Sequence, residues 1–411
     1  MLDIPPDKHR TMAKEGGLTY AVIGTAWLLL CPLLALPYIL WGIWHQRRGA
    51  YGLFSLWLGI MAYISFPSED LYRHYFLFTF LEIRPLSAIT WVDISLNGVL
   101  PFIYWIMGHT GIAYAWLRFA ELAIGFWLLT KVYRHMTEGI NLSVGGRFIR
   151  FGLLFLFFDF LYTVMGVKYG FALCTYVYSL HLLMNLNQRK GSLAMMALTC
   201  MWHSSFIFTA PMVWILYQLK LSKKQAIWLC ATLAVVAPIL IYTFGEAILG
   251  RRFDFYFSKK AANVVSYAAM TPIGVTLFIL PKLVVVPLAV VVMKHYSTDG
   301  RWCRIALGWI IMTAALMSNA VTLYRFWWSF MATGVMALFD AETRELLKPS
   351  AIRVLIISGI CFTCLNMLTY HKEVLNSPYY KDLYPAPLTL SQDYTKQEVY
   401  YKIQHDGDFR K

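Results

Sequence analysis

A lysine and a histidine lie at the ends of two apolar segments, where an ionisable side chain is costly. Lys168 opens the apolar run over residues 169–186, and His203, followed by Ser204 and Ser205, interrupts the next run. Ionisable residues beside segments of hydrocarbon length are rare and most often functional. Lysine binds phosphate as a point charge, and histidine titrates near neutral pH, so it can take a proton from a hydroxyl. The pair therefore predicts a site that binds an anionic group and activates a hydroxyl.

The two serines beside His203 raise an alternative, a serine nucleophile that the histidine activates. Neighbouring residues on a helix do not face each other, and the sequence places no carboxylate close by to orient the ring. We therefore expect His203 to act on a substrate hydroxyl. A purely structural role in capping a broken helix is the remaining alternative for it.

Acidic residues give two further kinds of candidate. Glu69 and Asp70 open a polar segment and fit either a catalytic acid or a solvated helix cap. Glu121 and Asp159 lie inside apolar runs, where each fits a buried partner of a cation or a proton-binding group of a transporter. The sequence holds no cysteine–histidine metal pattern and no glycine-rich phosphate loop after a strand. We expect no metal and no cofactor.

The elements that must hold these residues are membrane helices. Of the 411 residues, 59% are hydrophobic and 14% are charged, whereas charged residues make up about a quarter of a soluble globular chain. Repeated apolar runs of membrane length, separated by short polar turns, predict an all-α polytopic bundle of about 11 transmembrane helices with short re-entrant helices. The formal net charge of +14 fits cytoplasmic loops rich in Lys and Arg, and no segment resembles a nucleic-acid-binding module.

Basic turns set the orientation of the bundle. Taking Arg47 and Arg48 as cytoplasmic places residues 67–95 on the outer side. The segments 97–107 and 192–202 are too short to cross a bilayer, since about 11 residues rise about 17 Å in a helix. We interpret both as halves of re-entrant hairpins, the second of which breaks at the histidine. This arrangement brings the lysine and the histidine to the same outer face.

Three parts follow from the same pattern: a polar N-terminal segment (residues 1–17), a transmembrane domain (18–370) and a polar, tyrosine-rich tail on the outer side (371–411). The first span is expected over residues 18–44. We expect it to be retained, because no cleavable signal pattern precedes it. The sequence has no internal repeat of fixed period.

Cations collect on the outer side in this topology, against the usual bias of Lys and Arg toward the cytoplasm. A cavity that binds a phosphate-bearing substrate explains them. Interfacial anchors or surface ion pairs are the alternative for each single residue. The residues concerned are Arg73, His74, Arg84, Lys168, His203, Arg251, Arg252, Lys259, Lys260 and Arg325.

Four short motifs resemble, in their order and spacing, those of the EpsG-like branch of the Wzy-type polysaccharide polymerases. They are Asp70-Leu-Tyr72, Lys168-Tyr-Gly170-Phe-Ala172, the basic turn Arg189-Lys190, and His203-x-Ser205. The resemblance is clearest over residues 69–219. Two positions depart from it, since the family has arginine where this chain has Lys168 and a small residue where it has Phe206. Lysine keeps the charge but loses the two-pronged guanidinium.

This resemblance implies a multi-pass enzyme of the bacterial inner membrane with a fold like that of the GT-C glycosyltransferases. It would transfer a growing glycan from undecaprenyl pyrophosphate to a hydroxyl of the next lipid-linked repeat unit at the periplasmic face. The product would be a lipopolysaccharide O-antigen, a capsule or an exopolysaccharide. The implied partners are the undecaprenyl-pyrophosphate-linked oligosaccharide, the lipid bilayer and, as a further candidate, a regulator of chain length, with no nucleic acid.

The resemblance also assigns roles to residues. His203, Lys168 and Asp70 are the implied catalytic residues, with His203 acting on the acceptor hydroxyl and Lys168 on the pyrophosphate. No metal is needed where cations neutralise the leaving group. The implied substrate-binding residues are Tyr72, Arg73, Arg251, Arg252, Tyr256 and Arg325.

Three alternatives stay open at this point. A glycosyltransferase that takes its sugar from a polyprenyl phosphate would use Glu69 or Asp70 as catalytic acid or metal ligand. A membrane O-acetyltransferase is a weaker candidate. A transporter or flippase of a lipid-linked sugar would depend on Glu121 and Asp159 more than on the outer cations.

Overall fold

Wherever its structure is described, the chain forms helices alone. The computed structural model describes residues 6–65, 69–138, 140–160, 163, 167–249, 272–316, 320–369, 377, 379–390, 397 and 399, and all regular elements among these are helices. The all-α part of the expectation is therefore confirmed. Arg251, Arg252 and Tyr256 lie outside the described residues, and for Asp70 only the backbone of its helix is described.

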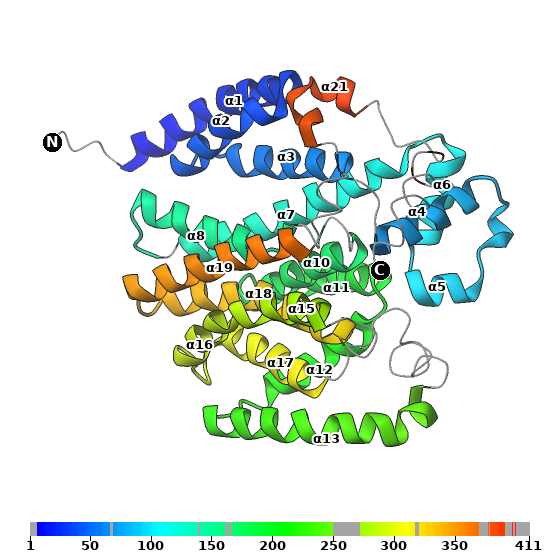
Figure 1. Ribbon diagram of the computed structural model, residues 1–411. Coiled ribbons are helices and arrows are strands. Elements are labelled where there is room, and N and C mark those ends of the chain that lie inside the picture. Colours follow the sequence, from blue (N-terminus) through cyan, green and yellow to red (C-terminus); the bar gives the residue numbers. More distant parts are fainter. Residues whose placement is uncertain are drawn as a thin grey trace.

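Most of the helices lie side by side along one common direction, and the short helices α4, α5 and α6 stand at one end of the bundle (Figure 1). The N-terminal half contains α1 (Pro6–Leu30), α2 (Pro32–Trp44), α3 (Ala50–Ile64), α4 (Glu69–Glu82), η1 (Leu86–Ala88), α5 (Trp91–Asn97), α6 (Leu100–His109), α7 (Tyr114–Glu138) and α8 (Val144–Leu156). The C-terminal half contains α10 (Val167–Met184), α11 (Arg189–Trp202), α12 (Phe206–Gln218), α13 (Lys223–Leu249), α15 (Pro272–Val284), α16 (Val286–Lys294), α17 (Arg301–Ala315), α18 (Ala320–Glu342), α19 (Pro349–Thr369), η4 (Tyr379–Leu383) and α21 (Ala386–Thr389).

One large apolar core joins these helices. α3 packs on α7, α7 on α10, α10 on α11 and α18, and α17 on α18. Trp302, Trp309 and Trp328 are fully buried in this core. Because protein interiors are close-packed, α10, α11 and α18 are held in fixed positions relative to one another. These three helices carry most of the candidate site.

The first apolar run is two helices, not one. Cys31 separates α1 from α2 with an extended backbone (φ −162°, ψ 101°). Pro32 follows it at the first turn of α2, where its missing N–H is tolerated, whereas inside a longer helix its ring would clash with the preceding turn. The two helices lie antiparallel, and Tyr20 stacks on Tyr38 with ring centroids 4.6 Å apart. The expected single span over residues 18–44 is wrong.

Short helices adjoin the candidate residues, as the sequence predicts. α6 has 10 residues, and α11 and α12 have 14 and 13 residues. α11 ends at Trp202 and α12 begins at Phe206, so the expected break at His203 is confirmed. A helix of this length rises about 20 Å, less than the roughly 30 Å of a hydrocarbon core. The pair therefore has the dimensions that a re-entrant hairpin requires.

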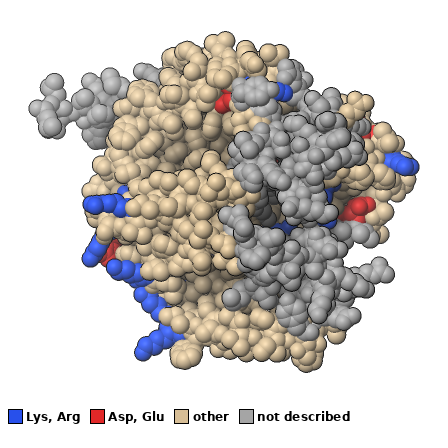
Figure 2. Space-filling view, viewed as in Figure 1, with Lys and Arg blue, Asp and Glu red and all other residues tan. Residues whose placement is uncertain are grey.

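Two of the described helices are long and apolar enough to cross a membrane, by length and composition: Lys223–Ile241 within α13, and α19. Figure 2 shows Lys and Arg gathered along one edge of the molecule, beside a broad surface without charged residues. Two basic turns meet where Lys223, the first residue of α13, donates from Nζ to the carbonyl of Lys294, the last residue of α16, at 3.0 Å. The sequence pattern predicts that these two basic turns lie on the same side of the bundle.

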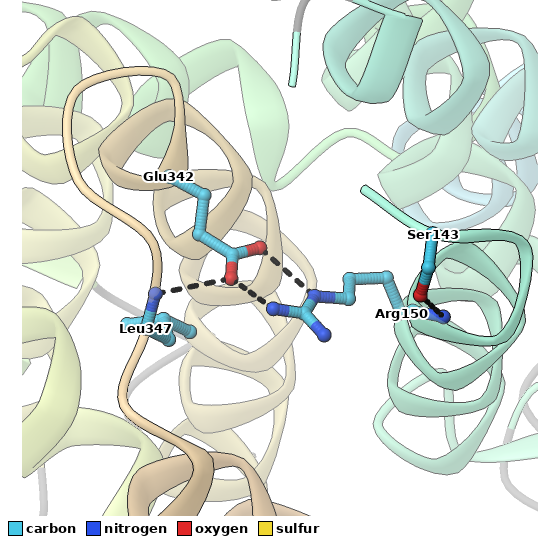
Figure 3. Close-up of polar contacts among 5 residues, drawn as sticks. Ser143, Arg150, Glu342 and Leu347 are labelled. Atoms are coloured by element: carbon cyan, nitrogen blue, oxygen red, sulfur yellow. Dashed lines mark hydrogen bonds and ion pairs between the residues drawn. The ribbon is translucent and has the colours of Figure 1, made fainter. Parts of the chain in front are cut away.

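A buried ion pair ties α8 to α18 (Figure 3). Arg150 donates from Nε to Oε2 of Glu342 at 3.1 Å, and its second guanidinium nitrogen donates to Oε1. The two side chains are 6% and 0% exposed. The backbone N–H of Leu347 also donates to Oε1 at 3.3 Å. Because all these groups are withdrawn from solvent, each depends on the others for its hydrogen bonds.

The C-terminal tail folds back onto the N-terminal helices. η4 lies against α2 and α3, and α21 lies against α1 (Figure 1). Trp57 donates its indole N–H to Oδ2 of Asp382 at 3.2 Å, and Tyr63 donates its hydroxyl to the carbonyl of Leu390 at 2.7 Å. The segment expected as a polar tail is therefore, over residues 379–390, a packed part of the helical domain.

Docking of this tail should depend on pH through Asp382. Burial raises the pKa of Asp382 from 3.8 to about 6, and the hydrogen bond from Trp57 opposes the rise. Below about pH 4 the carboxyl is protonated whether or not the tail is docked, but as the pH rises through about 6 the docked tail must bury a charge, so docking weakens. We expect faster hydrogen exchange in residues 379–390 at pH 8 than at pH 5, after correction for intrinsic rates. Asp382→Asn should remove the difference, and equal protection of the wild type at both values would contradict this assignment.

Candidate active site

The break between α11 and α12 holds His203. Its backbone is extended (φ −140°, ψ 106°), and the residue is 7% exposed. Its N–H donates to the carbonyl of Thr199 at 2.9 Å, and its carbonyl accepts the N–H of Phe206 at 3.1 Å. Both backbone groups are thus satisfied within the break, which fixes the position of the ring at a buried junction of two helices.

Tyr169 of α10 joins the elements of the site. Its ring meets the ring of His203 edge to face, with centroids 5.0 Å apart. Its hydroxyl donates to the backbone carbonyl of Arg325 at 3.0 Å and lies 2.6 Å from the hydroxyl of Ser329. The guanidinium carbon of Arg325 lies 5.8 Å from the centroid of the same ring. His203 and Arg325 therefore meet at the residue that follows Lys168.

Lys168 is held by the short helix α5. Its Nζ donates to Oδ1 of Asn97, the last residue of α5, at 3.0 Å. The next residue, Gly98, has φ +62° and lies against Met201, where a Cβ would come within 1.9 Å of the carbonyl oxygen. Val99 donates its N–H to the same carbonyl at 2.9 Å. Residues 97–99, called the α5 joint below, therefore hold both Lys168 and the C-terminal end of α11, just before the break at His203.

Replacing Asn97 tests whether this joint serves an anion site. The amide holds the ammonium group of Lys168 and adds no charge of its own. A hydrogen bond to a charged group is worth about 1.5–3 kcal/mol, so Asn97→Ala should weaken the binding of inorganic pyrophosphate about 10- to 100-fold. Asn97→Asp should weaken it at least as much, because it places a negative charge beside the lysine.

The control for these variants is Asn141→Ala, in an exposed loop before α8. Titration of purified protein with pyrophosphate gives the affinities, and thermal unfolding shows whether the variants stay folded. An Asn97→Asp variant that binds pyrophosphate as tightly as the wild type would show that Asn97 only ties α5 to α10.

The chain geometry at the break also brings Ser205 onto His203. Oγ of Ser205 lies 2.7 Å from Nδ1 of His203, and the backbone N–H of Ser205 donates to the same nitrogen at 3.3 Å. The expectation that the neighbouring serines would not face the histidine is wrong for Ser205. It assumed helical geometry, whereas the chain turns at residues 203–206: His203 is extended, its carbonyl accepts the N–H of Phe206, and the turn brings Ser205 back to the ring.

Tyr72 and Arg73 lie on α4, at the margin of the site. Tyr72 is half-buried and packs against the same apolar cluster of α4 and α6 as Trp202, the residue before His203. Arg73 is exposed. The structure therefore brings His203 and Arg325 to Tyr169, the residue after Lys168, and leaves Arg73 exposed on α4. His74, another of the outer cations, lies 2.9 Å through Nδ1 from the hydroxyl of Tyr104.

Two buried carboxylates border the site. Glu121 accepts a hydrogen bond from the indole N–H of Trp202, and Arg118, one turn earlier on α7, interacts with it electrostatically. Asp159 accepts a hydrogen bond from Tyr324, which precedes the arginine of the site. Each carboxylate is thus the partner of a buried donor. Such partners offset part of the cost of burying a charge.

Two residues of the site, Tyr169 and Asn97, were not predicted from the sequence. A tyrosine inside an apolar helix is typical of packing, so Tyr169 carried no signal of its own. Asn97 lies 71 residues from its partner, beyond the reach of any local pattern. Among the described residues, no three His, Cys, Asp or Glu side chains are grouped to hold a metal ion. No protein-family model, no curated protein and no solved structure matches this chain.

Proposed function

We propose that this chain is a multi-pass protein of the bacterial inner membrane. In the most apolar window of α13, 6% of the residues are buried, whereas the core helix of a soluble protein is mostly buried. Trp228, Val235 and Ile239 are among the large apolar side chains exposed on this helix. A large exposed apolar surface of this kind marks an interaction with a membrane or another apolar partner. The edge of basic turns would then face the cytoplasm.

The number of spans is part of this proposal. α13 and α19 cross the membrane as full spans, and the longer helices of the core cross beside them. The pairs α1–α2 and α11–α12 enter it and return, because α2 and α12 have 13 residues each. The bundle therefore has fewer complete crossings than the expected count of about 11.

We further propose that the protein elongates a glycan carried on undecaprenyl pyrophosphate. The observation that carries this proposal is that His203 and Arg325 meet at Tyr169, with Lys168 as the preceding residue of the same helix. Two cations beside a buried imidazole suit a pyrophosphate that leaves a sugar, since charge-assisted hydrogen bonds stabilise the negative charge that develops on it. Arg251 and Arg252, outside the described residues, belong to the same proposal.

The location of the group within the fold supports a reaction at the outer face. Lys168 contacts the end of α5, which lies with α4 and α6 at one end of the bundle (Figure 1). The basic turns lie at the opposite edge (Figure 2). A glycan elongated among the outer helices would be made on the periplasmic side, where its lipid-linked repeat units are available after transfer across the membrane.

The experiment that tests this function uses purified protein in liposomes with lipid-linked repeat units. Lengthened glycans on a gel, absent with His203→Ala, are the expected result. Wild-type protein that folds, inserts and lengthens no glycan would refute the proposal. A protein that instead moves the lipid-linked unit across the bilayer is the transporter alternative, and it would depend on Glu121 and Asp159.

The polyprenyl-phosphate alternative is separated by two substitutions. Its acid lies at Glu69 or Asp70, so Asp70→Asn would abolish transfer while His203→Ala would be tolerated. In the proposed polymerase, by contrast, His203→Ala would abolish transfer. Measuring both variants with both lipid donors distinguishes the two enzymes.

A further inference from the structure

We infer that His203 acts as a neutral hydrogen-bond donor to the departing pyrophosphate, through Nε2–H, and that Ser205 is the positioning residue that holds it in this form. This inference rests on the proposed function. It changes the role that the family resemblance implies for the histidine, from a base that takes a proton to a donor that keeps one.

The state of Nδ1 carries this inference. The backbone N–H of Ser205 donates to Nδ1 of His203 at 3.3 Å. A backbone N–H has no lone pair to offer, so Nδ1 must supply one. A neutral imidazole carries one N–H and one lone pair, and its proton therefore lies on Nε2. The hydroxyl of Ser205, 2.7 Å away, then donates to Nδ1 as well.

The same contacts disfavour a proton on Nδ1. A proton on Nδ1 would face the N–H of Ser205, and two donors cannot share one hydrogen bond. A base needs its lone pair on the nitrogen that meets the substrate, but here the lone pair of His203 is already used by Ser205. The remaining group of the ring is a donor.

The neighbours of His203 fit the same role. Tyr169 fixes the ring by an edge-to-face contact with an interplanar angle of 89°. Lys168 precedes this tyrosine in the chain, and the guanidinium of Arg325 lies beside its ring. A neutral N–H near two cations adds a third donor for phosphate oxygens without adding charge, and preorganised donors of this kind stabilise the charge of a leaving group.

The reaction balances without a protein base. The acceptor hydroxyl oxygen forms a bond to the anomeric carbon of the donor sugar while the bond from that carbon to the phosphate oxygen breaks. The electron pair leaves with the pyrophosphate, and the proton of the acceptor hydroxyl passes to a pyrophosphate oxygen. His203 gives a hydrogen bond in this step and retains its proton.

Replacing His203 by glutamine tests the role of the ring. The amide nitrogen of glutamine can donate from the position of Nε2, but it cannot take up a proton at neutral pH. We expect His203→Gln to elongate glycan within about 10-fold of the wild-type rate, and His203→Ala to fall about 100- to 1000-fold, the usual cost of one lost oxyanion donor. A His203→Gln variant that is folded and as inactive as His203→Ala would overturn the inference in favour of a base.

Ser205 has its own test, independent of activity. In protein labelled with ¹⁵N-histidine, the Nδ1 and Nε2 signals of His203, assigned by their loss in His203→Gln, should show a proton on Nε2 alone. Ser205→Ala should increase the second tautomer and lower kcat with little change in KM, and Ser205→Thr should restore both. A proton on Nδ1 in the wild type would refute the inference even where glycan elongation succeeds. Failure of elongation with the expected tautomer present would refute the proposed function instead.

Discussion

Replacing Lys168 by alanine should lower the rate of glycan elongation by about 100-fold or more, the loss expected when a charged donor to a leaving group is removed. The ammonium group lies 3.0 Å from Oδ1 of Asn97, which fixes its position at the α5 joint. In the proposed reaction, negative charge grows on the pyrophosphate as its bond to the sugar breaks. The cation should therefore act on kcat more than on KM, because its interaction is stronger in the transition state than with the bound substrate.

The comparison variants sharpen this expectation. Lys168→Arg should retain most of the rate, since guanidinium keeps the charge and adds a second prong toward phosphate. Lys168→Met keeps the length of the side chain without the charge and should match alanine. Lys224→Ala, an exposed lysine at the start of α13, is the control for loss of a cation elsewhere. A Lys168→Met variant as active as Lys224→Ala would exclude an electrostatic role.

Features set by local physics could be predicted from the sequence. The apolar runs predict helices, and the polar interruption at His203 predicts the end of one and the start of another, as the boundary between α11 and α12 confirms. The error at Cys31 and Pro32 had a local cause as well. Hydropathy alone joined two runs that the proline divides, and the rule that proline breaks a helix interior would have separated them.

Contacts between distant segments could not be predicted in this way. Tyr169 joins the site through the backbone of Arg325, 156 residues later, and Trp57 meets Asp382 across 325 residues. Neither pairing leaves a periodic pattern, because each depends on how whole helices pack. Ser205 and His203 are only two residues apart, yet their contact was missed because helical geometry was assumed where the chain makes a turn. The sequence thus indicated which residues are catalytic candidates, but it did not indicate which residues contact them.

Breaking the buried ion pair should be the most damaging single change to stability. Arg150 and Glu342 have side chains 6% and 0% exposed, and both guanidinium contacts of the pair end on the same carboxylate. Glu342→Ala would leave the arginine buried without its counter-charge, which costs about 3–5 kcal/mol. We expect the free energy of unfolding of the purified protein in detergent, measured by circular dichroism, to fall by this amount. Glu345→Ala, three residues later and exposed, is the control.

The double variant Arg150→Met with Glu342→Leu shows where the loss comes from. Hydrophobic residues that replace both members of a buried pair are often neutral or stabilising, whereas removal of one member is not. The double variant should therefore recover most of the stability that Glu342→Ala loses, although it makes no ion pair. If it is as unstable as the single variant, the contribution of Glu342 lies elsewhere, in its hydrogen bond to the backbone N–H of Leu347. Because the pair joins α8 to α18 at the end of the bundle remote from Lys168, the stable double variant should elongate glycan at the wild-type rate.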